Sequence, residues 1–299
     1  MSKFANLVVF IDGTGNNDFK KSVEEQTNVA RLWHACEEVS TDEVSQNVIY
    51  KPGVGTRRGE LVRGQARGGG GAYLSDRVNE AVSWLDNEVK IAKEDGRIPR
   101  IYLFGFSRGA YAVRWLATKI SYDIEVLGVW DTVKATLSGP DVEVASRNVK
   151  HAFHAIAIDE HRGLFDVTHF RNSPQAVEVW FPGCHSDVGG GYKEADLSYA
   201  PLNWMVRLST NYGLLVDQTK IPSEPYFDSA MPVVHDETQK FGWRFIGLCT
   251  FDHYFNRKVS TTDVVYPTVA QLRALGYSPD YLPQNCVAWN ENAAFANIV

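Results

Sequence analysis

The sequence has no apolar run that approaches the roughly 18 residues of a membrane-spanning helix. Its first residues, Met1–Gly15, contain too short an apolar run for a signal peptide. Basic residues are not in excess either: the net charge of −6 argues against a nucleic-acid-binding protein. The four cysteines show no C-x-x-C spacing, which favours buried thiols over disulfides or a zinc site. These absences predict a soluble protein made in the cytoplasm, with no transmembrane segment and no nucleic-acid partner, and no residue pattern calls for a cofactor or a metal.

The stretch Arg100–Trp115 carries the main chemical signal. Its apolar run Ile101–Phe104 is typical of a strand buried on both faces, and Ala110–Lys119 has the spacing of a helix. Between them, residues 105–109 form the pattern G-x-S-x-G. Strand, sharp turn and helix in this order predict a nucleophile elbow, with Ser107 as the catalytic nucleophile at the tip of the turn.

The 299 residues, 44% of them hydrophobic, are enough for one large core. Apolar runs that alternate with helical patterns predict an α/β fold with a mostly parallel, doubly wound sheet and helices on both faces. We expect strands over Asn6–Ile11, Asn47–Tyr50, Ile101–Phe104, Ile124–Trp130, Ala176–Phe181 and Trp243–Thr250. We expect helices over Thr27–Cys36, Tyr73–Lys90, Ala110–Lys119, Val149–Ile158, Leu197–Leu215 and Val269–Leu275. The prediction is a single α/β-hydrolase-like catalytic domain over residues 1–299.

Two long connections stand out, at about residues 57–72 and 138–174. Long loops inside compact domains are usually lids or binding loops, so we expect lid-like insertions here. The first connection is rich in arginine and glycine, and Arg57 and Arg58 carry charge suited to an anionic substrate. The second carries apolar side chains that either face an acyl chain or pack onto the core.

A nucleophilic serine needs a histidine base that is itself oriented by a carboxylate. In α/β-hydrolases these partners follow in the order Ser, Asp or Glu, His. The acid usually follows the second strand after the nucleophile strand, and the histidine follows the last strand. Strand counting therefore selects Asp187 as the acid and His253 as the base. Asp131 is an alternative acid, and His235 and His185 are alternative bases.

Backbone N–H groups are expected to form the oxyanion hole. One is the N–H of Arg108, the residue after the nucleophile. The second would come from Gly13 or Thr14, in the loop that follows the first strand at the carboxyl edge of the sheet.

Seven blocks of the sequence together resemble the Tle1-like phospholipase catalytic domains of type VI secretion, which are similar to α/β-hydrolases. They run in family order from about residue 7 to residue 192: FIDGTGN, TNVARL, YKPGVGT, LFGFSRGAYAVRWLA, LGVWDTV, HAIAIDEHRGLF and VWFPGCHSDVGGGY. Beyond residue 192 the likeness weakens. The family's two further histidine motifs contain serine, whereas this chain has His235-Asp236-Glu237 and His253-Tyr254-Phe255.

The resemblance implies serine hydrolysis of carboxylic esters, with phospholipids as the known substrate class. It also implies peripheral contact with a membrane, export as an effector and a secretion or immunity partner, none of which can be read from individual residues. Two alternatives are open. Asp12, Asp131 and Asp187 all end strands at one sheet edge, so a metal-dependent phosphoesterase is one. A non-catalytic binding module on a hydrolase scaffold is the other, since a fold does not establish an activity.

Overall fold

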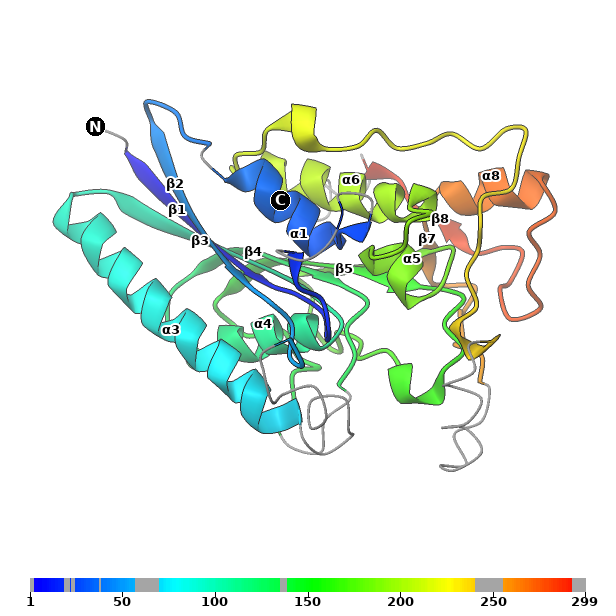
Figure 1. The fold of residues 1–299 in the computed structure, drawn as a ribbon, viewed down its shortest axis with the longest axis horizontal. Helices are drawn as coiled ribbons and strands as arrows, with labels where there is room; N and C mark the ends of the chain where they lie inside the picture. Colours follow the sequence, from blue (N-terminus) through cyan, green and yellow to red (C-terminus); the bar gives the residue numbers. More distant parts are fainter. Residues whose placement is uncertain are drawn as a thin grey trace.

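The computed structural model describes residues 3–18, 22, 25–37, 39–56, 70–134, 139–239 and 255–291. A parallel sheet forms the centre of this described part (Figure 1). Its strands are β1 (Phe4–Ile11), β2 (Val44–Lys51), β3 (Ile98–Phe106), β4 (Ile124–Trp130), β5 (Val149–Ala157), β6 (Ala176–Phe181), β7 (Val264–Val265) and β8 (Val287–Ala288). They lie in the order β2-β1-β3-β4-β5-β6-β7-β8, and every pairing is parallel. The predicted α/β class with a parallel sheet is confirmed.

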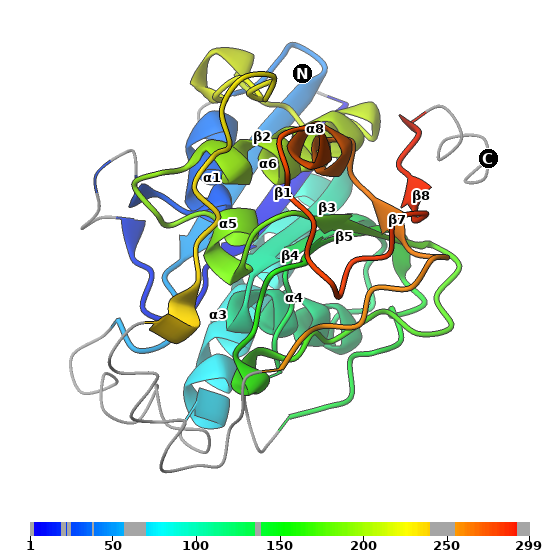
Figure 2. The same cartoon turned by 90° about the vertical axis from the view of Figure 1, so that its right-hand side faces the viewer.

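Helices cover both faces of the sheet (Figure 2). The α-helices are α1 (Asn28–Cys36), α3 (Gly70–Glu94), α4 (Arg108–Lys119), α5 (His185–Gly189), α6 (Asp196–Asn211) and α8 (Thr268–Ala274). Short 3₁₀ turns are η3 (Gly163–Phe165), η4 (Gln218–Lys220) and η5 (Glu237–Gln239). Within the described ranges, every helix is too short or too polar to cross a membrane.

Successive side chains of the central strands pack alternately into two separate hydrophobic cores, which is the physical reason for this layered fold. In β1, Val8 and Phe10 pack with α1 and α6, whereas Leu7 and Val9 pack with α3 and α4. A strand with apolar side chains on both faces must be covered on both, so its sequence reads as a continuous apolar run. Thr27 caps α1, because its side chain accepts a hydrogen bond from the backbone N–H of Ala30.

The expected helix over Val149–Ile158 is wrong, because these residues form the central strand β5. Phe153 of β5 lies opposite Gly128 of β4 and Val177 of β6. Phe153 packs in one core and Ala152 in the other, so the run is apolar on both faces, a pattern that a buried strand shares with a buried helix. The long connection over 138–174 is therefore divided by a strand, and Phe153 packs in the core.

Two further points concern the end of the chain. The strand expected over Trp243–Thr250 lies outside the described residues. The short strands β7 and β8 extend the sheet at an edge where the sequence shows no periodic signal. Each of these two strands has only two residues, which is too few for the apolar–polar alternation of a strand to be recognised in the sequence.

Candidate active site

Ser107 lies at the turn between β3 and α4, with φ 59° and ψ −128°. Positive φ is rare for a residue other than glycine and is typical of the strained nucleophile elbow. The two flanking glycines are required by close backbone approach: a Cβ on Gly105 would lie 2.6 Å from the Gly109 carbonyl oxygen, and one on Gly109 would lie 2.2 Å from that of Ile11. The expected elbow geometry is present, and it places Ser107 at the carboxyl end of β3.

Acidic residues follow the neighbouring strands at the same edge of the sheet. Asp12 follows β1, Asp131 follows β4, Asp159 follows β5, and Asp187 lies in α5, after β6. This edge is where α/β folds place their sites. Because β5 was expected to be a helix, Asp187 follows the third strand after the nucleophile strand, not the second as the strand count assumed.

Asp187 and His235 form a hydrogen-bonded acid–histidine pair. His235 Nδ1 donates to Asp187 Oδ1 at 2.7 Å, and the His235 backbone N–H donates to Oδ2 at 3.1 Å. The Cys184 backbone N–H also donates to Oδ2, at 2.9 Å. The Asp187 side chain is 1% exposed and that of His235 is 18% exposed. The hydrogen bond to Asp187 raises the pKa of His235 above its ordinary value.

Asp131 and His185 form a second pair that is fully enclosed. His185 Nδ1 donates to Asp131 Oδ2 at 2.5 Å, and Arg257 donates to both carboxylate oxygens, at 2.5 and 3.0 Å. The Ala157 N–H donates to Oδ1 at 3.0 Å. Burial acts to raise the pKa of Asp131, but the charge of Arg257 and the His185 hydrogen bond outweigh it and hold that pKa well below its usual range. Burial lowers the pKa of His185 despite its bond to Asp131.

Helix α5 connects these pairs to the elbow that carries Ser107. The His185 ring lies 4.5 Å from the ring of Phe106, the residue before Ser107. A Cβ on Gly189, the last residue of α5, would lie 2.0 Å from the Phe106 ring, so the helix and the elbow are in direct contact. The fold thus brings Ser107, Asp187 and Asp131 to one region from strands far apart in the sequence.

The two loop candidates for the oxyanion hole are Gly13 and Thr14. The Gly13 N–H already donates to Asp12 Oδ1 at 2.7 Å. The Thr14 hydroxyl is buried, and within the described part of the chain it has no hydrogen-bond partner. Arg108 is the first residue of α4, and burial lowers the pKa of its guanidinium to about 10.

Three expected site residues cannot be placed. His253, Arg57 and Arg58 lie outside the described residues, so their roles stay predictions.

The phosphoesterase alternative requires Asp12, Asp131 and Asp187 to share a cation. Asp12 Oδ2 instead accepts from the hydroxyls of Tyr50 at 2.6 Å and Thr27 at 2.8 Å. The other two carboxylates accept from separate donors, as described above. Over the described ranges, no three acidic, histidine or cysteine side chains are arranged to hold a metal ion.

Sequence reasoning missed two residues of this region. Arg257 is 1% exposed and binds Asp131 across 126 positions of sequence, a pairing that no local motif indicates. Tyr192 stacks on the His235 ring with centroids 3.9 Å apart. It ends the run HSDVGGGY, so its place in a dense motif was the available signal.

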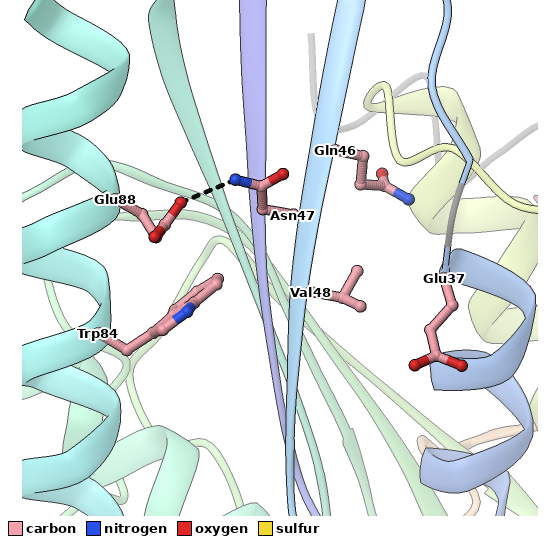
Figure 3. A pocket seen from close by; sticks show the side chains of 6 residues that line it. All are labelled: Glu37, Gln46, Asn47, Val48, Trp84 and Glu88. Atoms are coloured by element: carbon pink, nitrogen blue, oxygen red, sulfur yellow. Dashed lines mark hydrogen bonds between the residues drawn. The ribbon is translucent and has the colours of Figure 1, made fainter.

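A cavity of about 370 Å³ lies elsewhere, at the open edge of β2 (Figure 3). Its lining includes Trp84 and Glu88 of α3, on one side of the strand, and Glu37 on the other. Val48, which also lines it, sits mid-strand opposite Val8. This cavity is therefore away from the carboxyl edge that carries Ser107.

Comparison with known proteins shows which family model the chain matches. The family model described as the catalytic domain of the T6SS Tle1-like phospholipase effector matches residues 5–123 and 117–208. An uncharacterized protein of Saccharomyces cerevisiae is 32% identical over 79 residues, which is 25% of this chain and 11% of that protein.

Three solved structures resemble the fold. An uncharacterized protein from Pseudomonas aeruginosa aligns with a TM-score of 0.48 and 22% identity, over 72% of this chain and 47% of its own. The Tle1 effector bound to the VgrG spike of the type 6 secretion system aligns with a TM-score of 0.46 and 21% identity, over 64% and 52%. A cutinase-like protein from Cryptococcus sp. aligns with a TM-score of 0.31 and 11% identity, over 71% and 95%. The chain spans about half the length of the first two.

Proposed function

Because this chain belongs to the family of type VI secretion Tle1-like phospholipase catalytic domains, we propose that it is a serine hydrolase that cleaves carboxylic esters of phospholipids. Family membership supplies the coarse class, a lipid-hydrolysing enzyme. The observation that carries the finer assignment is geometric. Ser107 at a strained elbow and the Asp187–His235 pair occupy the same edge of the sheet and are connected through α5.

In the proposed reaction, His235 Nε2 accepts the Ser107 hydroxyl proton as Oγ attacks the ester carbonyl carbon. Asp187 holds the Nδ1–H and stabilises the imidazolium that forms. The imidazolium then donates its proton to the departing alcohol oxygen, which leaves an acyl group on Ser107. Water attacks this acyl-enzyme with His235 again as the base, and the fatty acid is released.

The choice between the two pairs rests on accessibility and charge. His235 is partly exposed and has a raised pKa, as a base that cycles through its charged form needs. His185 is buried against Phe106 and Phe165, and its carboxylate partner is already neutralised by Arg257. We therefore assign Ser107, Asp187 and His235 to the triad, and a supporting role to Asp131, although strand counting favoured His253 as the base.

The backbone N–H of Arg108 and that of Thr14 are proposed as the oxyanion donors. Gly13 is the weaker choice, because its N–H is held by Asp12. A donor that is already bonded must first break that bond, which reduces its contribution to the transition state. Membership in a family of secreted effectors further supports export, contact with a lipid surface and a secretion partner, as proposals.

The test replaces Ser107 by alanine and follows hydrolysis of a p-nitrophenyl ester and of phospholipid vesicles. We expect a loss of at least about three orders of magnitude, as removal of a covalent nucleophile causes. A fluorophosphonate should label the wild-type protein and not Ser107→Ala. Ser83→Ala is the matched control, because Ser83 is an exposed serine of α3 that donates to a carbonyl of its own helix, at Asn79. A Ser107→Ala protein that keeps more than a tenth of the activity would exclude the serine mechanism.

A further inference from the structure

Tyr192 lies directly against the proposed base. Its ring stacks on the His235 imidazole with centroids 3.9 Å apart and 22° between the ring planes. Such a stack restricts rotation of the imidazole about its bond to Cβ, because the rotated ring would collide with the flat phenol face. The Asp187 hydrogen bond fixes one edge of the imidazole and Tyr192 fixes one face.

The Tyr192 hydroxyl connects the two segments that carry the acid and the base. It donates to Glu237 Oε1, and Glu237 is two residues beyond His235. Cys184 Sγ lies 3.4 Å from the same hydroxyl oxygen. Burial raises the pKa of Cys184, so the thiol stays protonated and its S–H is available to that oxygen. Cys184 is the N-cap of α5, and its backbone N–H donates to Asp187.

We propose that Tyr192 is a positioning residue that holds the His235 imidazole in the orientation required for proton transfer with Ser107. This inference rests on the serine mechanism proposed above. Through its hydroxyl, Tyr192 ties the N-cap of the acid-bearing helix to the base-bearing segment, in parallel with the direct Asp187–His235 bond. Asp187 and His235 are thus connected in two ways: by their direct hydrogen bond, and by the contacts of Tyr192 with Cys184 and Glu237.

Charged groups from two other elements face the imidazole. Asp187 of α5 lies at Nδ1, and Glu194 lies between α5 and α6 with Oε2 at 3.7 Å from Nε2. The Glu194 side chain is 58% exposed, so water screens its attraction. Asp187 and Tyr192 therefore set the orientation of the imidazole. Glu194 holds Nε2 only weakly, so Nε2 stays available to Ser107.

The experiment separates the two contributions of Tyr192. Tyr192→Phe keeps the stacked ring and removes the hydroxyl bonds, whereas Tyr192→Leu removes both. With a soluble short-chain ester and active sites counted by fluorophosphonate titration, we expect kcat per site to fall about tenfold for Tyr192→Phe and about a hundredfold for Tyr192→Leu. KM should stay within about twofold, because Tyr192 orients the base and does not bind substrate.

A pH profile distinguishes positioning from mere folding. A loosened imidazole loses part of the Asp187 hydrogen bond that raises its pKa, so the acid limb of kcat/KM should move to lower pH in Tyr192→Leu. A purely structural defect would reduce the number of titrated sites and leave the limb in place. Tyr212→Phe and Tyr212→Leu are matched controls, because Tyr212 also stacks on a histidine, His151, at 3.7 Å and 21°. His151 lies opposite Val126, near the start of β4, so these variants should keep the wild-type kcat per site.

Wild-type kcat per site and an unmoved acid limb in both Tyr192 variants would overturn the inference. If Tyr192→Leu fails to fold, judged by circular dichroism, Tyr192→Phe decides on kcat alone. Failure of the serine mechanism has a different signature: no fluorophosphonate labelling of the wild-type protein and full activity in Ser107→Ala.

Discussion

Replacing Asp131 by asparagine should damage the fold, whereas replacing Asp187 by asparagine should damage the chemistry. Asp131 is fully buried and carries the charge that balances Arg257, which is 1% exposed. Asparagine at position 131 would remove the carboxylate that pairs with that guanidinium and leave only the more weakly acting charges of Glu160 and Asp166. Removing one partner of a buried ion pair costs about 3–5 kcal/mol in the free energy of unfolding. That is a large part of the roughly 5–15 kcal/mol that stabilises a typical domain.

The Asp187→Asn side chain could still accept the backbone N–H of Cys184, but its amide N–H₂ cannot accept the Nδ1–H of His235. The wrong tautomer or orientation of a catalytic histidine lowers kcat by about 10⁴. The unfolding free energy of Asp187→Asn should stay within about 2 kcal/mol of wild type, since one neutral hydrogen bond contributes about 1 kcal/mol.

Urea unfolding gives the free energy of unfolding of each variant, and kcat per fluorophosphonate-titrated site gives its activity. Both are measured on the same preparations. Asp86→Asn is the control, because Asp86 accepts a surface hydrogen bond from Tyr122 at 2.9 Å, and neither quantity should change beyond about 0.5 kcal/mol or twofold. The reasoning is refuted if Asp131→Asn keeps wild-type stability and loses more kcat than Asp187→Asn. Asp131 would then be the catalytic acid and His185 its base.

The acid limb of kcat/KM should lie above the ordinary histidine pKa of about 6.5, because His235 must be neutral to act and its pKa is raised by Asp187; rates from about pH 5 to 9 measure it, and a limb below about 6.5 would contradict the assignment. Stability should fall as pH drops below about 6.5, since burial lowers the pKa of His185 and the unfolded chain takes up the proton first. His235 has the opposite effect, because its raised pKa adds stability that is complete below about pH 6.5 and is lost as pH rises through the folded-state pKa. Urea midpoints of wild type and His235→Gln between about pH 5 and 8 distinguish the His185 contribution from the His235 contribution. Gly189→Ala should cost about 1–3 kcal/mol, because its Cβ would lie 2.0 Å from the ring of Phe106; an unchanged unfolding midpoint would show that the ring moves freely. Replacing Arg57 and Arg58 by alanine should raise KM for anionic lipid vesicles and spare a neutral short-chain ester; equal changes on both substrates would remove the headgroup role.

Local sequence was informative wherever the chemistry is contiguous. The elbow at Ser107 combines a buried strand, two glycines and a helix within the single stretch Arg100–Trp115, so its geometry follows from sterics that act over neighbouring positions. The apolar runs of β1, β3 and β4 were recognisable for the same reason, because both of their faces are covered. The run over Val149–Ala157 was misread, because a mostly buried stretch of nine residues with apolar side chains on both faces fits a buried strand and a buried helix alike.

The sequence by itself determined the elbow that carries Ser107, the α/β class and the edge of the sheet at which acidic residues gather. Strand counting placed Asp187 above Asp131 on a count that missed β5. The contact that distinguishes the two carboxylates comes from Arg257, which is 126 positions from Asp131 and reaches it only through folding. Strand counting selected His253 as the base, and the burial and partners that distinguish His185 from His235 are set by packing between distant segments. Local conformation is set by interactions along the chain, whereas charge pairing and access to solvent are set by packing between distant segments. Only the tertiary structure decided which acid was neutralised and which histidine stayed open to solvent.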